Sequence, residues 1–284
     1  MILKEIYTTY IKQLSSIYEK GEAEAITKIA IEYFTKIELS KILINGDKII
    51  DTNIYEKLED ALVQLLKNKP IQYITGYCWF YNLQFKVNEH VLIPRTETEE
   101  LVFEIISKIK KNNFKKIIDI GTGSGCIPIS IKKNVIDATV TAIDVSKDAL
   151  LIAKQNAVLN NVTIKFKEID FLNESQYNNL ETFDVIISNP PYIPENEKNS
   201  LAKNVTDYEP LLALFVPQND PLLFYKKILI FAETHLNKDG FIFLETHENF
   251  AKETAKLFVD KNYNVVIKKD MQEKERMLII NQNL

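Results

Sequence analysis

The segment IIDIGTGSGC, residues 117–126, decides which fold the sequence predicts. It contains three of the seven glycines of the chain, Gly121, Gly123 and Gly125, directly after an apolar run that includes Asp119. A glycine turn between a strand and a helix lets the backbone approach a ligand closely, and the helix N-terminus presents free N–H groups to that ligand. The segment therefore predicts an α/β sheet with a site for a nucleotide-like cofactor. A tight turn without a ligand is the alternative, because a glycine run alone is a weak signal.

Short apolar runs alternate with helical segments around this turn, a pattern typical of βαβ units in a parallel sheet. Seven strands are expected, at 116–120, 138–143, 162–167, 183–188, 241–245, 264–268 and 277–281. A helix at 98–111 is expected ahead of the first strand. Before that helix, aromatic and β-branched residues at 77–91 predict a hairpin that joins this domain to another.

The first quarter of the chain has a different pattern, in which apolar residues recur at helical spacing. One stripe consists of Leu3, Ile6, Tyr7, Tyr10, Ile11, Leu14, Ile17 and Tyr18. Asn53 followed by Glu56 resembles a capping box ahead of a further stripe. We expect a small helical bundle over residues 1–76, a hairpin linker over 77–95 and the α/β domain over 96–284.

The composition is that of an ordinary globular protein, with 46% hydrophobic and 26% charged residues. It excludes collagen-like, disordered and disulfide-scaffold classes, and 284 residues favour one full domain plus a smaller one. The 35 Lys and Arg against 39 Asp and Glu give a net charge of -4. We therefore expect no direct nucleic-acid partner, because no overall electrostatic attraction draws the chain to a polyanion.

Cysteine, histidine and hydropathy patterns limit the remaining classes. Cys78 and Cys126 are the only cysteines, too few for a disulfide framework or a cysteine metal site, which suits a reducing compartment. The three histidines lack metal-ligand spacing, so no metal is expected. The first residues lack the apolar run of a signal peptide, and no later run has transmembrane length. We expect a cytoplasmic monomer that does not bind membranes.

Acidic residues at two further strand ends extend the cofactor pattern. Asp144 ends the second strand about twenty residues beyond the glycines, where such folds place a carboxylate that accepts hydrogen bonds from ribose hydroxyls. Its alternative role is helix capping. Asp170 and Phe171 end the third strand and could accept from an adenine amino group and stack on its ring. The glycine spacing is G-x-G-x-G rather than G-x-G-x-x-G, which favours S-adenosylmethionine over NAD.

The fourth strand ends in Asn189-Pro190-Pro191-Tyr192, at the carboxyl edge where such sheets bind ligands. A planar amide or aromatic amine is a poor nucleophile, because its nitrogen lone pair is delocalised. The Asn189 side-chain oxygen and the Pro190 carbonyl can each accept one N–H of a target NH2 group and aim its nitrogen at a methyl group. The prolines stiffen the loop, and Tyr192 can pack on the flat target group. A rigid strand-end turn is the alternative.

At this point the chain resembles the protein-(glutamine-N5) methyltransferases that modify peptide chain release factors. The resemblance covers nearly the whole length. It is carried by PIQY at 70–73 with Gly76, LIPRTETEELV from 92, IIDIGTGSGC from 117, AIDVSKDAL from 142, SNPPYI from 188, YEPLLAL from 208 and DGFIFLETH from 239. The segments from 92 and from 208 are much more specific to this family than the glycine turn or the Asn-Pro-Pro-Tyr element.

The resemblance implies a seven-stranded Rossmann-like class I methyltransferase domain whose last strand is antiparallel, preceded by a helical bundle and a β-hairpin. It implies S-adenosylmethionine as cofactor, with S-adenosylhomocysteine as product. The cofactor-binding residues would be Gly121, Thr122, Gly123, Ser124, Gly125, Asp144, Asp170, Phe171 and Asn189. Relatives often carry tryptophan in place of Phe171.

By the same resemblance, Asn189, Pro190, Pro191 and Tyr192 would hold the glutamine of a Gly-Gly-Gln loop, with Asn189, Pro190 and Tyr192 as the catalytic residues. The helical bundle would dock the protein substrate. We expect Arg95 to tie the hairpin to the α/β domain. Glu209 lies either at the substrate entrance or in a turn that opens the next helix.

Three other functions remain open on the sequence alone. An adenine-N6 methyltransferase acting on nucleic acid is one, because an adenine amino group presents similar N–H donors to the same corner. A glutamine methyltransferase acting on a ribosomal protein shares the chemistry and differs in its partner. A binding protein without catalytic activity is the third.

Overall fold

A computed structural model of the chain describes residues 1–42 and 44–282. The chain divides into two compact units. The first consists of Met1–Gly76 together with Ala202–Tyr208, and the second consists of Tyr77–Leu201 and the residues from Glu209 onward. The segment Ala202–Tyr208 was assigned to the α/β domain from the sequence, whereas the structure groups it with the helical unit.

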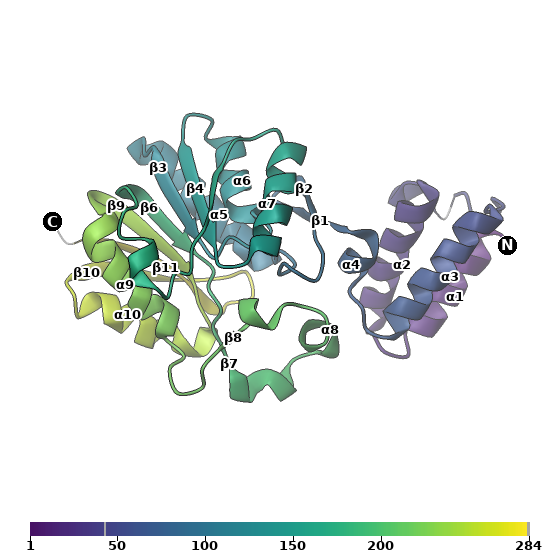
Figure 1. The fold of residues 1–284 in the computed structure, drawn as a ribbon. Coiled ribbons are helices and arrows are strands. Elements are labelled where there is room, and N and C mark those ends of the chain that lie inside the picture. Colours follow the sequence, from purple (N-terminus) through teal and green to yellow (C-terminus); the bar gives the residue numbers. More distant parts are fainter. Residues whose placement is uncertain (43, 283–284) are drawn as a thin grey trace. The chain divides into compact units, whose positions relative to one another are not determined.

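The first unit is built from helices (Figure 1). They are α1 (Leu3–Leu14), α2 (Lys20–Thr35), η1 (Leu39–Lys41), α3 (Thr52–Leu66), α4 (Ile71–Thr75) and the short α8 (Lys203–Thr206). Their apolar stripes form one core, which includes Leu3, Ile6, Tyr10, Leu14, Ile26, Leu58, Leu62 and Leu65. The Tyr208 hydroxyl donates to the Lys67 carbonyl over 2.8 Å, within the same unit.

The predicted capping box at Asn53 and Glu56 is wrong by two residues. Helix α3 is capped by Asp51, whose side chain accepts from the Asn53 N–H over 2.9 Å. Aspartate is among the preferred N-cap residues, and its position decides where the helix begins.

The second unit opens with the predicted hairpin, formed by β1 (Tyr77–Phe80) and β2 (Leu83–Lys86). The two-residue turn uses Tyr81 and Asn82, both with positive φ, at 49° and 59°. Two left-handed residues in succession give the turn whose twist matches antiparallel strands. The Tyr81 N–H is fixed by the Glu99 carboxylate at 2.9 Å.

A seven-stranded sheet forms the centre of this unit, in the order β10-β11-β9-β6-β3-β4-β5. The strands are β3 (Lys116–Ile120), β4 (Thr139–Asp144), β5 (Lys165–Glu168), β6 (Phe183–Ser188), β9 (Leu236–Glu245), β10 (Tyr263–Lys269) and β11 (Glu275–Gln282). Strand β11 runs opposite to the other six strands of this sheet. The predicted α/β fold with seven strands and an antiparallel last strand is confirmed.

Helices flank the sheet (Figure 1). They are α5 (Thr96–Asn112), α6 (Cys126–Asn134), α7 (Lys147–Leu159), α9 (Leu223–His235) and α10 (Ala251–Val259), with short turns η2 (Glu174–Gln176), η3 (Glu195–Ser200), η4 (Leu211–Ala213) and η5 (Glu248–Phe250) and a small pair β7 (Ile193–Pro194) and β8 (Phe215–Val216). Helix α6 packs on α5 and α7, while α9 packs on α10. A core cluster joins the sheet to α9 and α10 through side chains such as Ile118, Ile186, Phe231 and Phe258.

The two largest differences between predicted and observed strand boundaries have identifiable reasons. Strand β5 begins at Lys165, because the Val162 N–H still bonds the Ala157 carbonyl of the preceding helix end over 3.0 Å. Strand β9 begins at Leu236, five residues early, because Leu236 pairs with Phe183 ahead of a register shift. Neither the hydrogen bond of Val162 nor the pairing of Leu236 can be predicted from the spacing of apolar residues.

The sheet register brings the predicted functional segments together. Ile120 at the end of β3 pairs with Ile143 of β4 on one side and with Ser188 of β6 on the other. The residues that follow these three strand ends leave the sheet at one edge, because parallel strands all finish at the same side.

Candidate functional site

A cavity of about 380 Å³ lies at this carboxyl edge of the sheet. Among the residues proposed from the sequence, those that line it are Gly121, Gly123, Asp144, Asp170, Phe171, Asn189, Pro190 and Pro191. The volume is typical of a small-molecule site. Thr122, Ser124, Gly125 and Tyr192 are not among the lining residues.

The three glycines of the turn serve two different purposes. Gly121 and Gly123 have positive φ, at 75° and 54°, and a Cβ at either position would meet nothing within 4 Å. They leave open space beside the backbone, as a ligand requires. At Gly125 a Cβ would come within 3.1 Å of the Ala153 Cβ, so this glycine allows α6 to pack against α7. Thr122 and Ser124 are buried within the turn.

Asp144 holds the glycine turn in place. Its Oδ2 accepts from the Gly123 N–H over 2.8 Å, and its Oδ1 accepts from the Ser146 N–H over 2.9 Å. Burial raises the pKa of Asp144, while these N–H groups lower it. Helix α7 is capped by Ser146 rather than by Asp144. Each carboxylate oxygen has a second lone pair, so Asp144 can still accept from ribose hydroxyls at the cavity wall.

Asp119 is a buried carboxylate at the same turn, with 1% of its surface exposed. Neither of its oxygens has a hydrogen-bond partner among the described residues. Burial raises its pKa to about 7, opposed by the nearby Thr122 hydroxyl and reinforced by the charge of Asp144. An orphaned buried carboxylate is costly unless something supplies a donor or a positive charge. The turn therefore fits a ligand that carries such a group.

Phe171 and Asp170 form the far wall. The Phe171 ring is held between Tyr177 and Phe231, with centroid separations of 5.1 and 5.5 Å. Asp170 accepts from the Leu172 N–H over 3.0 Å, which shapes the turn after β5. Both residues line the cavity.

The Asn189 corner is held by side chains from distant parts of the sequence. The Asn189 Nδ2 donates to the Thr98 Oγ1 over 3.3 Å, so its Oδ1 is turned away from that hydroxyl. Asn189, Pro190 and Pro191 line the cavity. The role of this corner as an acceptor for a ligand NH2 group stays a prediction.

Tyr192 is oriented differently from the prediction. Its hydroxyl lies 3.4 Å from the Glu245 Oε1, and its ring packs on the core and lies 6.1 Å from His247. The structure does not bring this ring to the cavity wall, where it was expected to pack on the target group. The tyrosine hydroxyl thus makes a long hydrogen bond to the buried Glu245 carboxylate.

Arg95 and Glu209 form a partly buried ion pair beside the cavity. The Arg95 guanidinium lies 2.6 Å from the Glu209 Oε1, and the Ile93 N–H donates to Oε2 over 3.3 Å. Arg95 thus ties the segment after the hairpin to the α/β domain. Glu209 itself is only 4% exposed, whereas Pro210 and Leu212 directly after it line the cavity. The carboxylate fixes the chain that forms the rim.

Several functional positions were missed by the sequence reasoning. His90, Leu92, Leu172 and Phe224 also line the cavity, but a single histidine or apolar residue beside a loop gives no distinctive signal. Asn156 in α7 is fully buried and bonds both the Lys86 backbone and the Ser124 carbonyl. It joins the hairpin edge to the glycine turn. An asparagine in mid-helix reveals such a role only when its partners are known.

Neither a metal cluster nor a membrane helix is present in the described part of the chain. No group of three or more His, Cys, Asp or Glu residues within 1–42 and 44–282 could hold a metal ion. Likewise, no helix in those ranges is long and apolar enough to cross a bilayer. Both cysteines are free and buried, and burial raises the pKa of the Cys78 thiol to about 12.

Two family descriptions match separate parts of the chain. Residues 5–76 match the PrmC N-terminal domain, and residues 103–207 match the methyltransferase small domain. A solved structure, the ribosomal protein L11 methylase from Lactobacillus delbrueckii subsp. bulgaricus, aligns with a TM-score of 0.50 at 18% identity. It covers 68% of this chain and 82% of that one. At this identity the likeness concerns the fold alone.

Curated relatives match over almost the entire length. The release factor glutamine methyltransferase of Flavobacterium psychrophilum is 44% identical over 99% of this chain and 99% of its own. The protein of the same name from Bacteroides thetaiotaomicron is 38% identical over 96% of this chain and 98% of its own. The chain belongs to the family of release factor glutamine methyltransferases.

Proposed function

We propose that this protein transfers a methyl group from S-adenosylmethionine to the side-chain amide nitrogen, N5, of the glutamine in the Gly-Gly-Gln loop of a peptide chain release factor. One observation carries the proposal: the open glycine turn, Asp144 and the Asn189-Pro190 corner line one cavity of about 380 Å³. A methyl donor and a carboxamide acceptor bound there would be neighbours. The names of the relatives supply the substrate.

The residues of the turn fit S-adenosylmethionine, which supplies an activated methyl group on a sulfonium and leaves as S-adenosylhomocysteine. Gly121 and Gly123 leave room beside the backbone, and Asp144 accepts from the ribose hydroxyls. Asp170 and Phe171 take the adenine. Thr122, Ser124 and Gly125 act indirectly, because they build the turn and its junction with α6.

Asn189 and Pro190 bind and orient the glutamine. The Asn189 Oδ1 and the Pro190 carbonyl each accept one N–H of the target NH2 group, which directs the nitrogen lone pair toward the methyl group. As the nitrogen–carbon bond forms and the carbon–sulfur bond breaks, positive charge develops on nitrogen, and the same two oxygens stabilise it. The nitrogen then gives up one of its two protons to solvent, which leaves a neutral N-methyl amide. No general base has to act before the transfer.

The helical unit is proposed to dock the protein substrate. It has its own core and matches a separate family description. A remote docking surface would lower KM for the whole release factor relative to a short Gly-Gly-Gln peptide. The proposal includes a cytoplasmic monomer without nucleic-acid or membrane partners, and the two free thiols suit a reducing compartment.

The test uses labelled S-adenosylmethionine and a release factor that carries either Gln or Glu in its Gly-Gly-Gln loop. Label should enter the Gln form only, and mass spectrometry should locate it on the side-chain amide. A ribosomal protein and adenine-containing DNA serve as competing acceptors. Methylation of either one in preference to the release factor would overturn the assignment.

A further inference from the structure

A buried carboxylate lies directly behind the Asn189 corner. Glu245 ends β9, the strand that pairs with β6, and Ser188 of β6 is in register with Leu244. Asn189 and Glu245 therefore each come one residue after two residues that face each other on adjacent strands. Glu245 is only 3% exposed, and Thr98 of α5 beside it is 2% exposed.

Hydrogen bonds connect these groups in a defined direction. The Thr98 hydroxyl lies 2.6 Å from the Glu245 Oε2, and the Tyr192 hydroxyl lies 3.4 Å from Oε1. The Asn189 Nδ2 lies 3.3 Å from the Thr98 Oγ1. An ionised carboxylate can only accept, so the single Thr98 proton is given to Glu245. The Thr98 oxygen is then available to Asn189 only as an acceptor.

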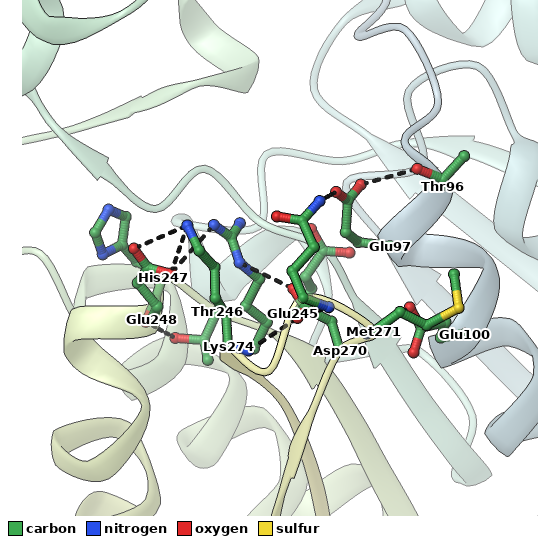
Figure 2. A network of polar contacts seen from close by, with 12 residues as sticks. Thr96, Glu97, Glu100, Glu245, Thr246, His247, Glu248, Asp270, Met271 and Lys274 are labelled. Atoms are coloured by element: carbon green, nitrogen blue, oxygen red, sulfur yellow. Dashed lines mark hydrogen bonds and ion pairs between the residues drawn. The ribbon is translucent and has the colours of Figure 1, made fainter.

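The pKa of Glu245 is raised on balance, although three neighbouring groups favour its ionised form. Burial raises the pKa of Glu245, but the Thr98 hydroxyl, the positive Arg276 and the Tyr192 hydroxyl act against it. Figure 2 shows Glu245 beside a polar network that includes Glu248, Asp270 and Lys274. Arg276 belongs to that network through ion pairs to Asp270 at 3.3 Å and to Glu248 at 3.5 Å.

We propose that Glu245 and Thr98 are positioning residues that hold the Asn189 amide with its nitrogen toward Thr98 and its oxygen toward the cavity, and that Tyr192 supports this arrangement by holding Glu245. The inference rests on the proposed function, because only an NH2 substrate makes the direction of the amide matter. With the amide reversed, two NH2 groups would face each other and transfer would lose one of its acceptors.

The central test is Thr98→Val, which keeps the shape of the side chain and removes the hydroxyl. We expect kcat for methylation of the release factor to fall about tenfold or more, with KM and the Kd of S-adenosylmethionine changed less than about twofold. Thr98→Ser restores the hydroxyl and should recover most of kcat. Glu245→Gln should also lower kcat, because an amide can donate to Thr98 and reverse the chain of hydrogen bonds.

Thr254→Val is the matched control. Thr254 of α10 is a fully buried threonine whose Oγ1 has no hydrogen-bond partner in the described part of the chain. Its substitution should leave kcat unchanged. If valine in the core had a general effect on kcat, that effect would appear in both Thr98→Val and Thr254→Val. Equal kcat values for Thr98→Val and Thr254→Val would overturn the inference.

A readout that does not depend on activity separates this inference from the proposed function. The side-chain ¹⁵N–H2 resonances of Asn189 should shift or broaden in Thr98→Val and Glu245→Gln but not in Thr254→Val. Unchanged resonances in both would refute the orienting role. If the wild-type protein instead transfers no methyl group to glutamine while these resonances respond as expected, the proposed function fails and the orientation stands.

Discussion

The two walls of the cavity are held in different ways. The glycine turn is fixed by groups close to it in the sequence, since Asp144 bonds Gly123 twenty-one residues away. The Asn189 corner depends on partners 91 and 53 residues distant, namely Thr98 for Asn189 and Glu245 for Tyr192. One wall is a local backbone structure, whereas the other is a tertiary arrangement of side chains. Substitutions on the two sides should therefore have separable effects on cofactor binding and on transfer.

The largest effect is expected at the corner itself. Asn189→Ala removes an acceptor that stabilises charge during transfer, so kcat should fall by about 10² to 10³. The Kd of S-adenosylmethionine, measured by calorimetry, should change less than about threefold. Full activity in this variant would contradict the proposed role of the corner.

The second effect contrasts the two buried carboxylates. Glu245 has two hydroxyl partners, whereas Asp119 has no hydrogen-bond partner among the described residues. Because the pKa of Asp119 is raised from 3.8 to about 7, the folded protein holds this proton more tightly than the unfolded chain. Stability should consequently be lost as pH rises from about 4 to about 7.

Asp119→Asn removes that titration. Urea unfolding at pH 5 and pH 8 should show a smaller loss of stability in the variant, by on the order of 2 to 3 kcal/mol. A pH dependence identical to that of the wild-type protein would mean that Asp119 is ionised at little cost.

A third effect tests how the glycine turn is attached to the hairpin. Asn156→Ala leaves the Lys86 N–H and the Ser124 carbonyl without their partner, and buried polar groups left unpaired are costly. We expect a loss of about 2 kcal/mol in unfolding free energy by denaturant titration. Asn112→Ala, in an exposed position at the end of α5, is the control and should cost well under 1 kcal/mol.

The smallest effect is expected for Asp144→Asn. One amide oxygen can still accept a backbone N–H, but the amide nitrogen cannot accept from a ribose hydroxyl. The Kd of S-adenosylmethionine should rise about tenfold, with kcat at saturating cofactor changed less than about threefold. A fall in kcat without any change in Kd would mean that Asp144 acts in methyl transfer rather than in cofactor binding.

Local patterns made most of the fold predictable. The apolar runs of the strands and the glycines at 121, 123 and 125 carry their information within a few residues, and so do Asp144 and the Asn189 corner. The helical stripes of the first unit are equally local. The order of the strands in the sheet was not predicted, because adjacency in a sheet has no periodic signal.

Thr98 and Glu245 escaped prediction because they act through a distant contact. Thr98 and Glu245 are 147 residues apart, and no local sequence pattern around either residue predicts the hydrogen bond between them. The orientation of Tyr192 has no local signal either, since an aromatic ring beside a binding motif can face the ligand or the core. The cap at Asp51 was missed because two acceptable capping residues stand two positions apart.

The pairing of β6 with β9 has a consequence for how the corner tolerates motion. The amide that receives the substrate and the carboxylate that steadies it leave the sheet from strands joined by backbone hydrogen bonds. If thermal fluctuations change the twist of the sheet, both groups are carried along together and their separation is preserved. The distance between Asn189 and Glu245 should therefore change little when the sheet fluctuates. Helix α5, which supplies Thr98, is not part of the sheet, so its displacement would alter the arrangement first.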